Sequence, residues 1–332
     1  ILKARSFEDY LGPGNTTFTW NTLSTYFQGD YGWRDLTMAF GGRFDFVTLD
    51  NQTKASKPVF NAGLSYEIGH NNFVRFGYGQ SFRIPSLAER FVKEQITSVR
   101  LGGDPISIFA GPNPDIRPET GYTYEIGFKK IIKTPKFEAK IDAAVFYQRF
   151  LDFTEFTFGQ YNDPIDSSSY IGFRQENVAD ARTLGWEATI SATNKFKNAA
   201  LTYQFGYTYN FVTNADEDTV YQKFGNLVKG AFSGFKITDE EYASFYDGGD
   251  QNILYGMMRY RFRHTIKTDI NVDVKKISFG TNIRYYGFLD RVDAVFALFI
   301  PGIQEFRDSQ NYKGDFVVDL RVRYHFSENF TL

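Results

Sequence analysis

Cationic side chains recur at every second position in one stretch of the chain. Arg259, Arg261 and Arg263 alternate with apolar residues, and Arg284 lies on the polar register of the next alternating segment. Because alternate residues of a β-strand point to the same face, these guanidinium groups would share one surface. Such a surface attracts anionic ligands, for example phosphates, acidic sugars or ferric siderophores. The competing interpretation is a ladder of ion pairs with acidic residues of other segments: Glu125, Glu138, Asp142, Glu187 and Asp269.

The long segments between the predicted strands are rich in aromatic side chains. They suit stacking on a siderophore or glycan, or contact with a partner protein. The candidate ligand-binding residues are Tyr221, Tyr242 and Tyr246 in segment 213–258 and Phe299 in the apolar run 295–301. The alternative is that these segments pack on themselves and on their neighbours.

No residues are arranged for catalysis. The chain has no cysteine and only 3 histidines, which excludes disulfides, iron–sulfur clusters and a thiol nucleophile. Serine hydrolase, phosphate-loop and metalloprotease motifs are absent. The acidic stretches 163–166 and 214–218 do not match a calcium-binding loop. We therefore predict no enzyme activity, no cofactor and no metal, and the net charge of −2 argues against nucleic acid as a partner.

The elements that position these residues are predicted to be long β-strands. In residues 201–211 and 315–326, apolar and polar side chains alternate strictly, a period of two that a helix cannot place on one face. The pattern continues for ten residues or more, whereas strands of soluble proteins usually have about 5–6. We predict eleven strands: 16–28, 34–48, 58–69, 72–84, 120–132, 136–155, 174–194, 199–213, 258–274, 277–288 and 313–327.

The predicted connections alternate between short and long. Short ones lie near 29–33, 69–72, 132–136, 194–199, 274–277 and 327–329. Long ones lie near 48–58, 85–119, 155–175, 213–258 and 289–313. This alternation is typical of up-and-down membrane barrels, which have short periplasmic turns and long outer loops.

Composition also favours a membrane barrel. Aromatic residues make up 18% of the chain. The sequence contains no run of 18 apolar residues, the length that a transmembrane helix needs. A closed barrel is the other structure that can span a bilayer. Its apolar face would contact lipid and its polar face would line the lumen. An odd number of eleven strands, together with the abrupt first and last residues, indicates that the chain is a segment of a larger barrel.

Two motifs flank the long segment 85–119. Residues 80–91 read QSFRIPSLAERF, and residues 113–127 read NPDIRPETGYTYEIG. The pair resembles the "FRxPS" and "NPxLxPE…YExG" boxes in the barrel of TonB-dependent outer-membrane receptors. Residues 182–187, RTLGWE, also resemble a strand of this family. Arg83 and Arg90 of the first box are further candidates for ligand binding, although both boxes could serve only to shape the loop and to pair within the barrel wall.

The resemblance implies an all-β, antiparallel barrel of about 22 strands, of which residues 1–332 form one partial domain. It also implies an N-terminal plug domain and a closing strand outside this sequence, outer-membrane lipid as surroundings, and energy from TonB–ExbB–ExbD acting through the plug. The expected function is active import of a scarce ligand across the bacterial outer membrane. A surface lipoprotein is an additional candidate partner.

Other functions stay open at this stage. The chain could be an accessory or scaffold subunit of an outer-membrane complex, an alternative motivated by the apolar segment 289–313. A passive porin and a soluble β-sandwich are less favoured. Heme receptors of the family resemble the same two boxes with a histidine between them, but residues 86–112 contain none. The expected ligand is a siderophore, a glycan or a similar compound, with peptides and cobalamin also open.

Overall fold

The computed structural model describes residues 19–49, 53–101, 104–164, 167–214, 261–287, 314–327 and 330–331. These residues form one 14-stranded sheet and one short helix. In chain order the elements are β1 (Trp20–Trp33), β2 (Leu36–Leu49), β3 (Thr53–Glu67), β4 (Asn72–Arg83), α2 (Leu87–Phe91), β5 (Glu94–Leu101), β6 (Asp104–Gly111), β7 (Glu119–Lys133), β8 (Phe137–Asn162), β9 (Ser169–Lys195), β10 (Ala199–Asn214), β11 (His264–Val274), β12 (Ile277–Tyr286), β13 (Asp315–Ser327) and β14 (Phe330–Thr331).

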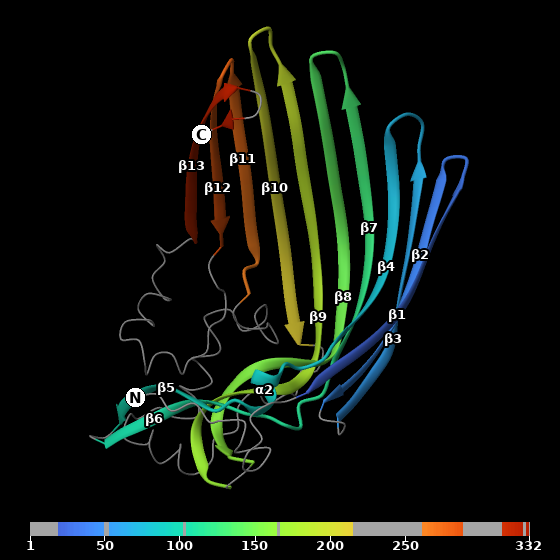
Figure 1. Cartoon of the computed structure of the whole chain (residues 1–332). Coiled ribbons are helices and arrows are strands. Elements are labelled where there is room, and N and C mark those ends of the chain that lie inside the picture. The colour runs from blue at the N-terminus through green and yellow to red at the C-terminus, as the bar shows by residue number, and fades with distance from the viewer. Residues whose placement is uncertain are drawn as a thin grey trace.

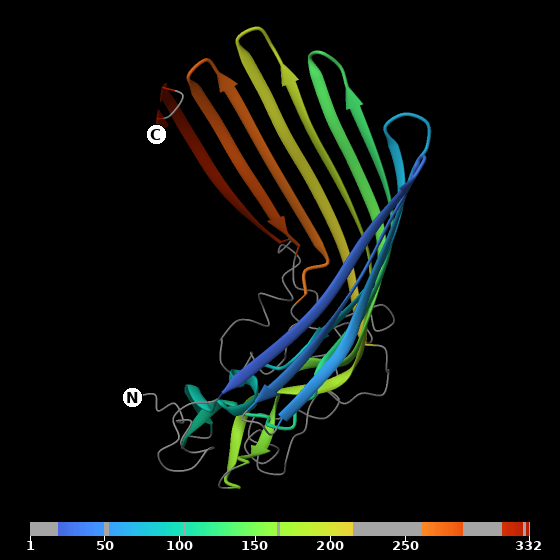
Figure 2. The ribbon, with the colours of Figure 1, turned by 45° about the vertical axis from the view of Figure 1, so that its right-hand side comes forward.

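The sheet is an open, curved wall of antiparallel strands. Each strand pairs with its neighbours in the order β1-β2-β3-β4-β7-β8-β9-β10-β11-β12-β13-β14. Figure 1 shows the short hairpins gathered at one end of the wall and α2, β5 and β6 at the other. Figure 2 shows that the wall curves like part of a tube, with its two edges apart. All eleven predicted strands are present as β1 to β4 and β7 to β13.

Large apolar side chains line one face of the wall, which we call the apolar face. Register places Leu64, Phe76, Ile126, Val145 and Trp186 directly opposite one another on successive strands. Each of these side chains is 40% to 63% exposed. A row of exposed Leu, Phe, Ile, Val and Trp would be costly in water, whereas hydrocarbon surroundings accept it.

Charged side chains on the other face, the polar face, pair across the strands. Arg75 Nη1 lies 2.7 Å from Asp142 Oδ1, two strands away. Between them is Gly127, where a Cβ atom would lie 2.7 Å from Arg75 Nε, so glycine leaves the space that the arginine crosses. Arg321 reaches Asp269 at 2.7 Å across Gly280 in the same manner. Two acidic residues of the predicted ladder, Asp142 and Asp269, therefore form ion pairs, but with Arg75 and Arg321, which are not the cations named in the prediction.

The long predicted loop 85–119 contains structure that we did not expect. It holds helix α2 and the hairpin β5–β6, and β8 and β9 extend to residues 162 and 169 instead of ending near 155 and 174. β6 pairs with β9 in parallel, from Ile108↔Ile171 to Gly111↔Arg174. We call the unit made of α2, β5, β6 and residues 153–162 and 169–177 the cap. Both ribbon views show the ends of β8 and β9 bending away from the wall to join it.

The cap has its own small core. Its buried apolar side chains include those of Ile108, Phe158, Tyr161, Tyr170 and Ile171. At Gly172 a Cβ atom would lie 1.9 Å from the backbone oxygen of Phe109. Only glycine therefore lets β9 approach β6 this closely.

The first hairpin also differs from expectation. The connection predicted at 29–33 is instead at residues 34–35, with Arg34 at φ 54°. Gly29, which we interpreted as a turn residue, lies within β1. The Phe40 ring on β2 lies over it, and a Cβ atom at Gly29 would be only 2.7 Å from Cζ of that ring. The glycine makes room for an aromatic ring on the apolar face and does not form a turn.

Candidate functional site

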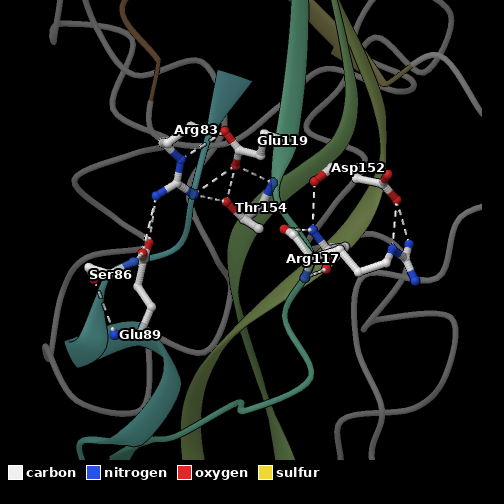
Figure 3. A network of polar contacts seen from close by, with 8 residues as sticks. Arg83, Ser86, Glu89, Arg117, Glu119, Asp152 and Thr154 are labelled. Carbon is white, nitrogen blue, oxygen red and sulfur yellow. Dashed lines mark hydrogen bonds and ion pairs between the residues drawn. The ribbon is translucent and has the colours of Figure 1, made fainter. Parts of the chain in front are cut away.

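The two sequence motifs meet where β4 ends and β7 begins, and Figure 3 shows their contacts. Arg83 and Glu119 are register partners at the ends of these strands. The guanidinium group donates from Nε to Glu119 Oε2 at 2.9 Å and from Nη2 to Oε1 at 2.8 Å. This two-point pairing fixes orientation as well as distance. The Glu119 side chain is only 11% exposed, so its carboxylate is well shielded.

Helix α2 completes what we call the mouth network: Arg83, Ser86, Glu89, Glu119 and Thr154. Arg83 Nη1 also donates to Glu89 Oε1 at 3.0 Å. Ser86 and Glu89 form a capping box, in which the Glu89 N–H donates to Ser86 Oγ and the Ser86 N–H donates to Glu89 Oε2 at 2.6 Å. The box stabilises the start of a helix of only five residues, which begins at Leu87 directly after its N-cap Ser86.

Thr154 joins the network from the bulged part of β8. Its backbone N–H donates to Glu119 Oε1 at 2.8 Å, and its hydroxyl contacts both Glu119 and Arg83. Both carboxylates around Arg83 are therefore compensated. An anionic ligand would have to compete with Glu89 and Glu119 for this guanidinium group, so the geometry favours a junction that anchors the cap.

A second polar junction holds the segment that precedes β7. Arg117 Nε donates to Asp152 Oδ1 at 2.9 Å, and Asp152 has a positive φ of 54° at the β8 bulge. The Asn177 amide donates to the backbone oxygens of Arg117 and Asp152, and its oxygen accepts from the Arg117 N–H. Asn177 thus ties β9 to the segment before β7 and to the β8 bulge, at the point where β8 leaves the wall.

A buried ion pair lies inside the cap. Lys93 Nζ is 2.8 Å from Asp163 Oδ2, and the two side chains are 12% and 0% exposed. The ammonium group also lies 4.7 Å from the centre of the Tyr170 ring and 5.2 Å from that of Phe109. These contacts join the segment between α2 and β5 to the tip of the β8–β9 hairpin. Sequence reasoning missed this pair because its members are 70 residues apart and belong to no motif.

The structure disperses the other predicted ligand-binding residues that it describes. Arg90 Nη2 donates to the Ile116 backbone oxygen at 3.1 Å, and Arg284 pairs with Asp319 at 2.8 Å. Arg261 and Arg263 precede β11 and lie over the rings of Phe153 and Phe211, respectively. They do not form the single-strand ladder that alternation predicts. The remaining candidates, Arg259, Tyr221, Tyr242, Tyr246 and Phe299, lie outside the described residues.

The mouth network leads to a prediction about pH. Burial alone would raise the pKa of Glu89, but hydrogen bonds from the Ser86 backbone and the Arg83 guanidinium outweigh it and leave this pKa lowered. A carboxylate with a lowered pKa stabilises the folded state above its ordinary value, near 4.5, and this contribution is lost as pH falls below that value. We expect α2 to loosen below about pH 4.5.

A spin label can measure this loosening. The chain has no cysteine, so Ala88→Cys gives one labelling position on the exposed side of α2. Label mobility should rise as pH falls, and the added Glu89→Gln substitution should make mobility high at every pH. An unchanged pH response in the Glu89→Gln protein would contradict the assignment.

Comparison with known proteins identifies the family. The family model described as "TonB dependent receptor-like, beta-barrel" matches residues 4–332. The chain belongs to the TonB-dependent receptor family. Members of this family are receptors and transporters of the outer membrane, which confirms the location predicted from the strands. Within the described residues, no helix is long and apolar enough to span a membrane.

Solved TonB-dependent receptors share the fold of this chain. The siderophore receptor PirA from Acinetobacter baumannii matches with a TM-score of 0.53 and 14% identity over 93% of this chain. The ferric-catecholate import receptor Fiu from E. coli matches with a TM-score of 0.53 and 16% identity over 95%. The copper transporter OprC matches with a TM-score of 0.56 and 13% identity over 96%. This chain covers 40%, 39% and 41% of these structures, respectively.

A curated relative is similar in sequence. A hemin receptor from Yersinia enterocolitica is 26% identical over 152 residues, which is 43% of this chain and 22% of that protein. The chain therefore spans a minor part of the receptors that it resembles.

Proposed function

We propose that this chain forms part of the barrel of a TonB-dependent receptor that imports a scarce ligand across the outer membrane. The observation that supports it is the difference between the two faces of the wall. Large apolar side chains are exposed on one face, and charged groups pair across strands on the other. Such a wall separates lipid from a polar lumen. A plug domain that TonB–ExbB–ExbD acts upon would lie in that lumen.

The first ligand to test is a ferric siderophore. Two of the structural relatives are named as receptors for siderophores or ferric catecholates. Cationic side chains near the mouth, including Arg90 and Arg261, would attract such an anion. The curated relative is a hemin receptor, but residues 86–112 here have no histidine to ligate heme iron. A glycan is the second ligand class to test.

Uptake by cells that carry the whole receptor tests this proposal. We expect accumulation of a radiolabelled ferric siderophore to require both the receptor and TonB. Uptake that continues without TonB would contradict active import and favour a passive pore. Tight binding without any uptake would also contradict it.

The scaffold alternative lacks support in the described residues. The apolar segment 289–313, which motivated it, lies outside them. Stable purification with a large outer-membrane complex, with no transport of any ligand, would favour this alternative over import.

A further inference from the structure

Three neighbouring short turns of the wall carry a cluster of lysines. The turns join β7 to β8, β9 to β10 and β11 to β12, and they lie at the end of the wall opposite the cap (Figure 1). Backbone hydrogen bonds link them. The Lys195 N–H donates to the Lys136 oxygen at 2.8 Å, and the Lys275 N–H donates to an oxygen of the middle turn at 3.3 Å. We call the exposed lysines at these turns the basic rim: Lys136, Lys195, Lys197, Lys275 and Lys276.

The basic rim carries positive charge that the described part of the chain leaves uncompensated. Among the described residues, none of its five lysines takes part in an ion pair. The turn residues 134–136, 196–198 and 275–276 include no Asp or Glu, and the nearby Glu138 pairs with Lys133, which lies outside the rim. The turn between β1 and β2 differs, because there Arg34 is followed by Asp35. The excess of positive charge is therefore a property of these three turns.

One of the lysines occupies a position for which its side chain is poorly suited. Lys275 and Lys276 alone connect β11 to β12, and Lys275 has a positive φ of 52°. Two-residue turns favour Asn and Gly, which adopt positive φ more easily than a lysine does. The turn also places two like charges next to each other. An anionic surface beside the turn would compensate both costs.

The basic rim begins where the apolar face ends. The last row of that face contains Val274, Ile277 and Tyr324, which are register partners on β11, β12 and β13 and are 37% to 41% exposed. Two lysines of the rim follow Val274 directly. At the middle turn, Phe196 stands between two other rim lysines and is 63% exposed. An exposed ring between lysines suits a lipid interface, where apolar groups contact acyl chains and ammonium groups reach the headgroups.

The end of the wall that carries the basic rim is the periplasmic end, because short turns of outer-membrane barrels face the periplasm. The rim therefore lies at the headgroups of the inner leaflet. We propose that the basic rim binds anionic phospholipids of this leaflet through their phosphate groups. The inference rests on the placement of the apolar face in lipid, as proposed above, but not on import of any ligand.

Native mass spectrometry of the purified whole receptor tests the proposal. The receptor is titrated with phosphatidylglycerol or with phosphatidylcholine of the same acyl chains, and we expect it to bind phosphatidylglycerol more tightly. The Lys136→Gln/Lys195→Gln protein lacks two neighbouring lysines of the rim. It should bind phosphatidylglycerol about twenty-fivefold more weakly, at about fivefold for each lysine near an anionic lipid surface. Its binding of phosphatidylcholine should not change.

A second variant separates lipid binding from a structural role. Asn suits the positive φ of the β11–β12 turn, so Lys275→Asn should raise the midpoint of thermal unfolding in neutral detergent. The same protein should bind phosphatidylglycerol about fivefold more weakly. If stability and binding fell together, the lysine would have a structural role and the proposal would be wrong.

A matched control removes the same charge from the other face. Lys129 and Lys267 lie on the polar face, opposite Asp142 and Arg284. The Lys129→Gln/Lys267→Gln protein should bind phosphatidylglycerol as the unmodified receptor does. Equal binding of the two lipids, unchanged binding in Lys136→Gln/Lys195→Gln, or an equal loss in the polar-face variant would overturn the proposal.

The competing occupants of the basic rim are an acidic periplasmic protein and a free anion. Polyglutamate and glycerol phosphate represent them in the same assay, and neither should displace phosphatidylglycerol. Displacement by polyglutamate would identify a protein-binding surface, and displacement by millimolar glycerol phosphate would identify a free-anion site. Either result would overturn the proposal. The assay involves no transport, so its outcome is independent of whether the receptor imports a siderophore.

Discussion

Replacement of Lys93 by methionine is expected to lower the free energy of cap unfolding by about 3–5 kcal/mol, the usual cost of removing one partner from a buried ion pair. Asp163 is 0% exposed and would keep its charge without a cation. We expect hydrogen exchange of backbone amides in residues 156–162 and 169–175 to become at least a hundredfold faster. The strands of the wall should keep their protection.

Two further variants make this expectation specific. Lys133→Met removes a cation whose partner is Glu138 at 3.4 Å, with both side chains more than half exposed, and should change stability by less than about 1 kcal/mol. Lys93→Met/Asp163→Leu removes both buried charges, and it should recover most of the loss, since apolar side chains can replace a buried pair. If the double variant were less stable than the single one, burial of an uncompensated charge would not be the cause.

Replacement of Arg83 by methionine is expected to release α2 from the end of β4, at a cost of about 2–3 kcal/mol. Glu119 and Glu89 are 11% and 16% exposed and both depend on this guanidinium group. The expected cost is smaller than for Lys93 because Arg83 itself is 45% exposed. Hydrogen exchange of the α2 amides and the mobility of a label at residue 88 should both increase.

Arg117 offers the matched comparison for Arg83. It lies in the second sequence motif and pairs with Asp152, but the two side chains are 65% and 43% exposed. Arg117→Met should therefore cost no more than about 1 kcal/mol. Arg83→Lys should restore only part of the loss, because an ammonium group lacks the fork that matches Glu119. Equal effects of Arg83→Met and Arg117→Met would show that the mouth network does not anchor the cap.

The wall could be predicted from the sequence because its determinants are local. Strict alternation in stretches such as 201–211 fixes both the strand and the face of each side chain. The partners of Arg75 were also within reach, since Glu125 and Asp142 have the register that a lumen ladder requires. The first turn was misplaced because glycine can either form a turn or leave room for a neighbouring ring. Only the position of Phe40 on the next strand shows that Gly29 does the second.

The cap could not be predicted as a unit. One of its signals was readable, because Ser86 and Glu89 have the spacing of a capping box. The parallel pairing of β6 with β9 was not, because no rule of alternation selects a partner about 60 residues away. For the same reason Thr154 was missed in the mouth network, although Arg83 and Glu119 were both in the motifs that drew attention to it.

The parallel β6–β9 ladder also constrains the order in which the molecule folds. Residues 108–111 of β6 can pair only with an ordered β9 at residues 171–174. That part of β9 is in turn ordered by its pairing with β8. Closing so large a loop costs chain entropy before any contact compensates it. We therefore expect the wall hairpins that close over a few residues to assemble before this ladder. We also expect the cap to become native late and to open early when the protein is heated or denaturant is added.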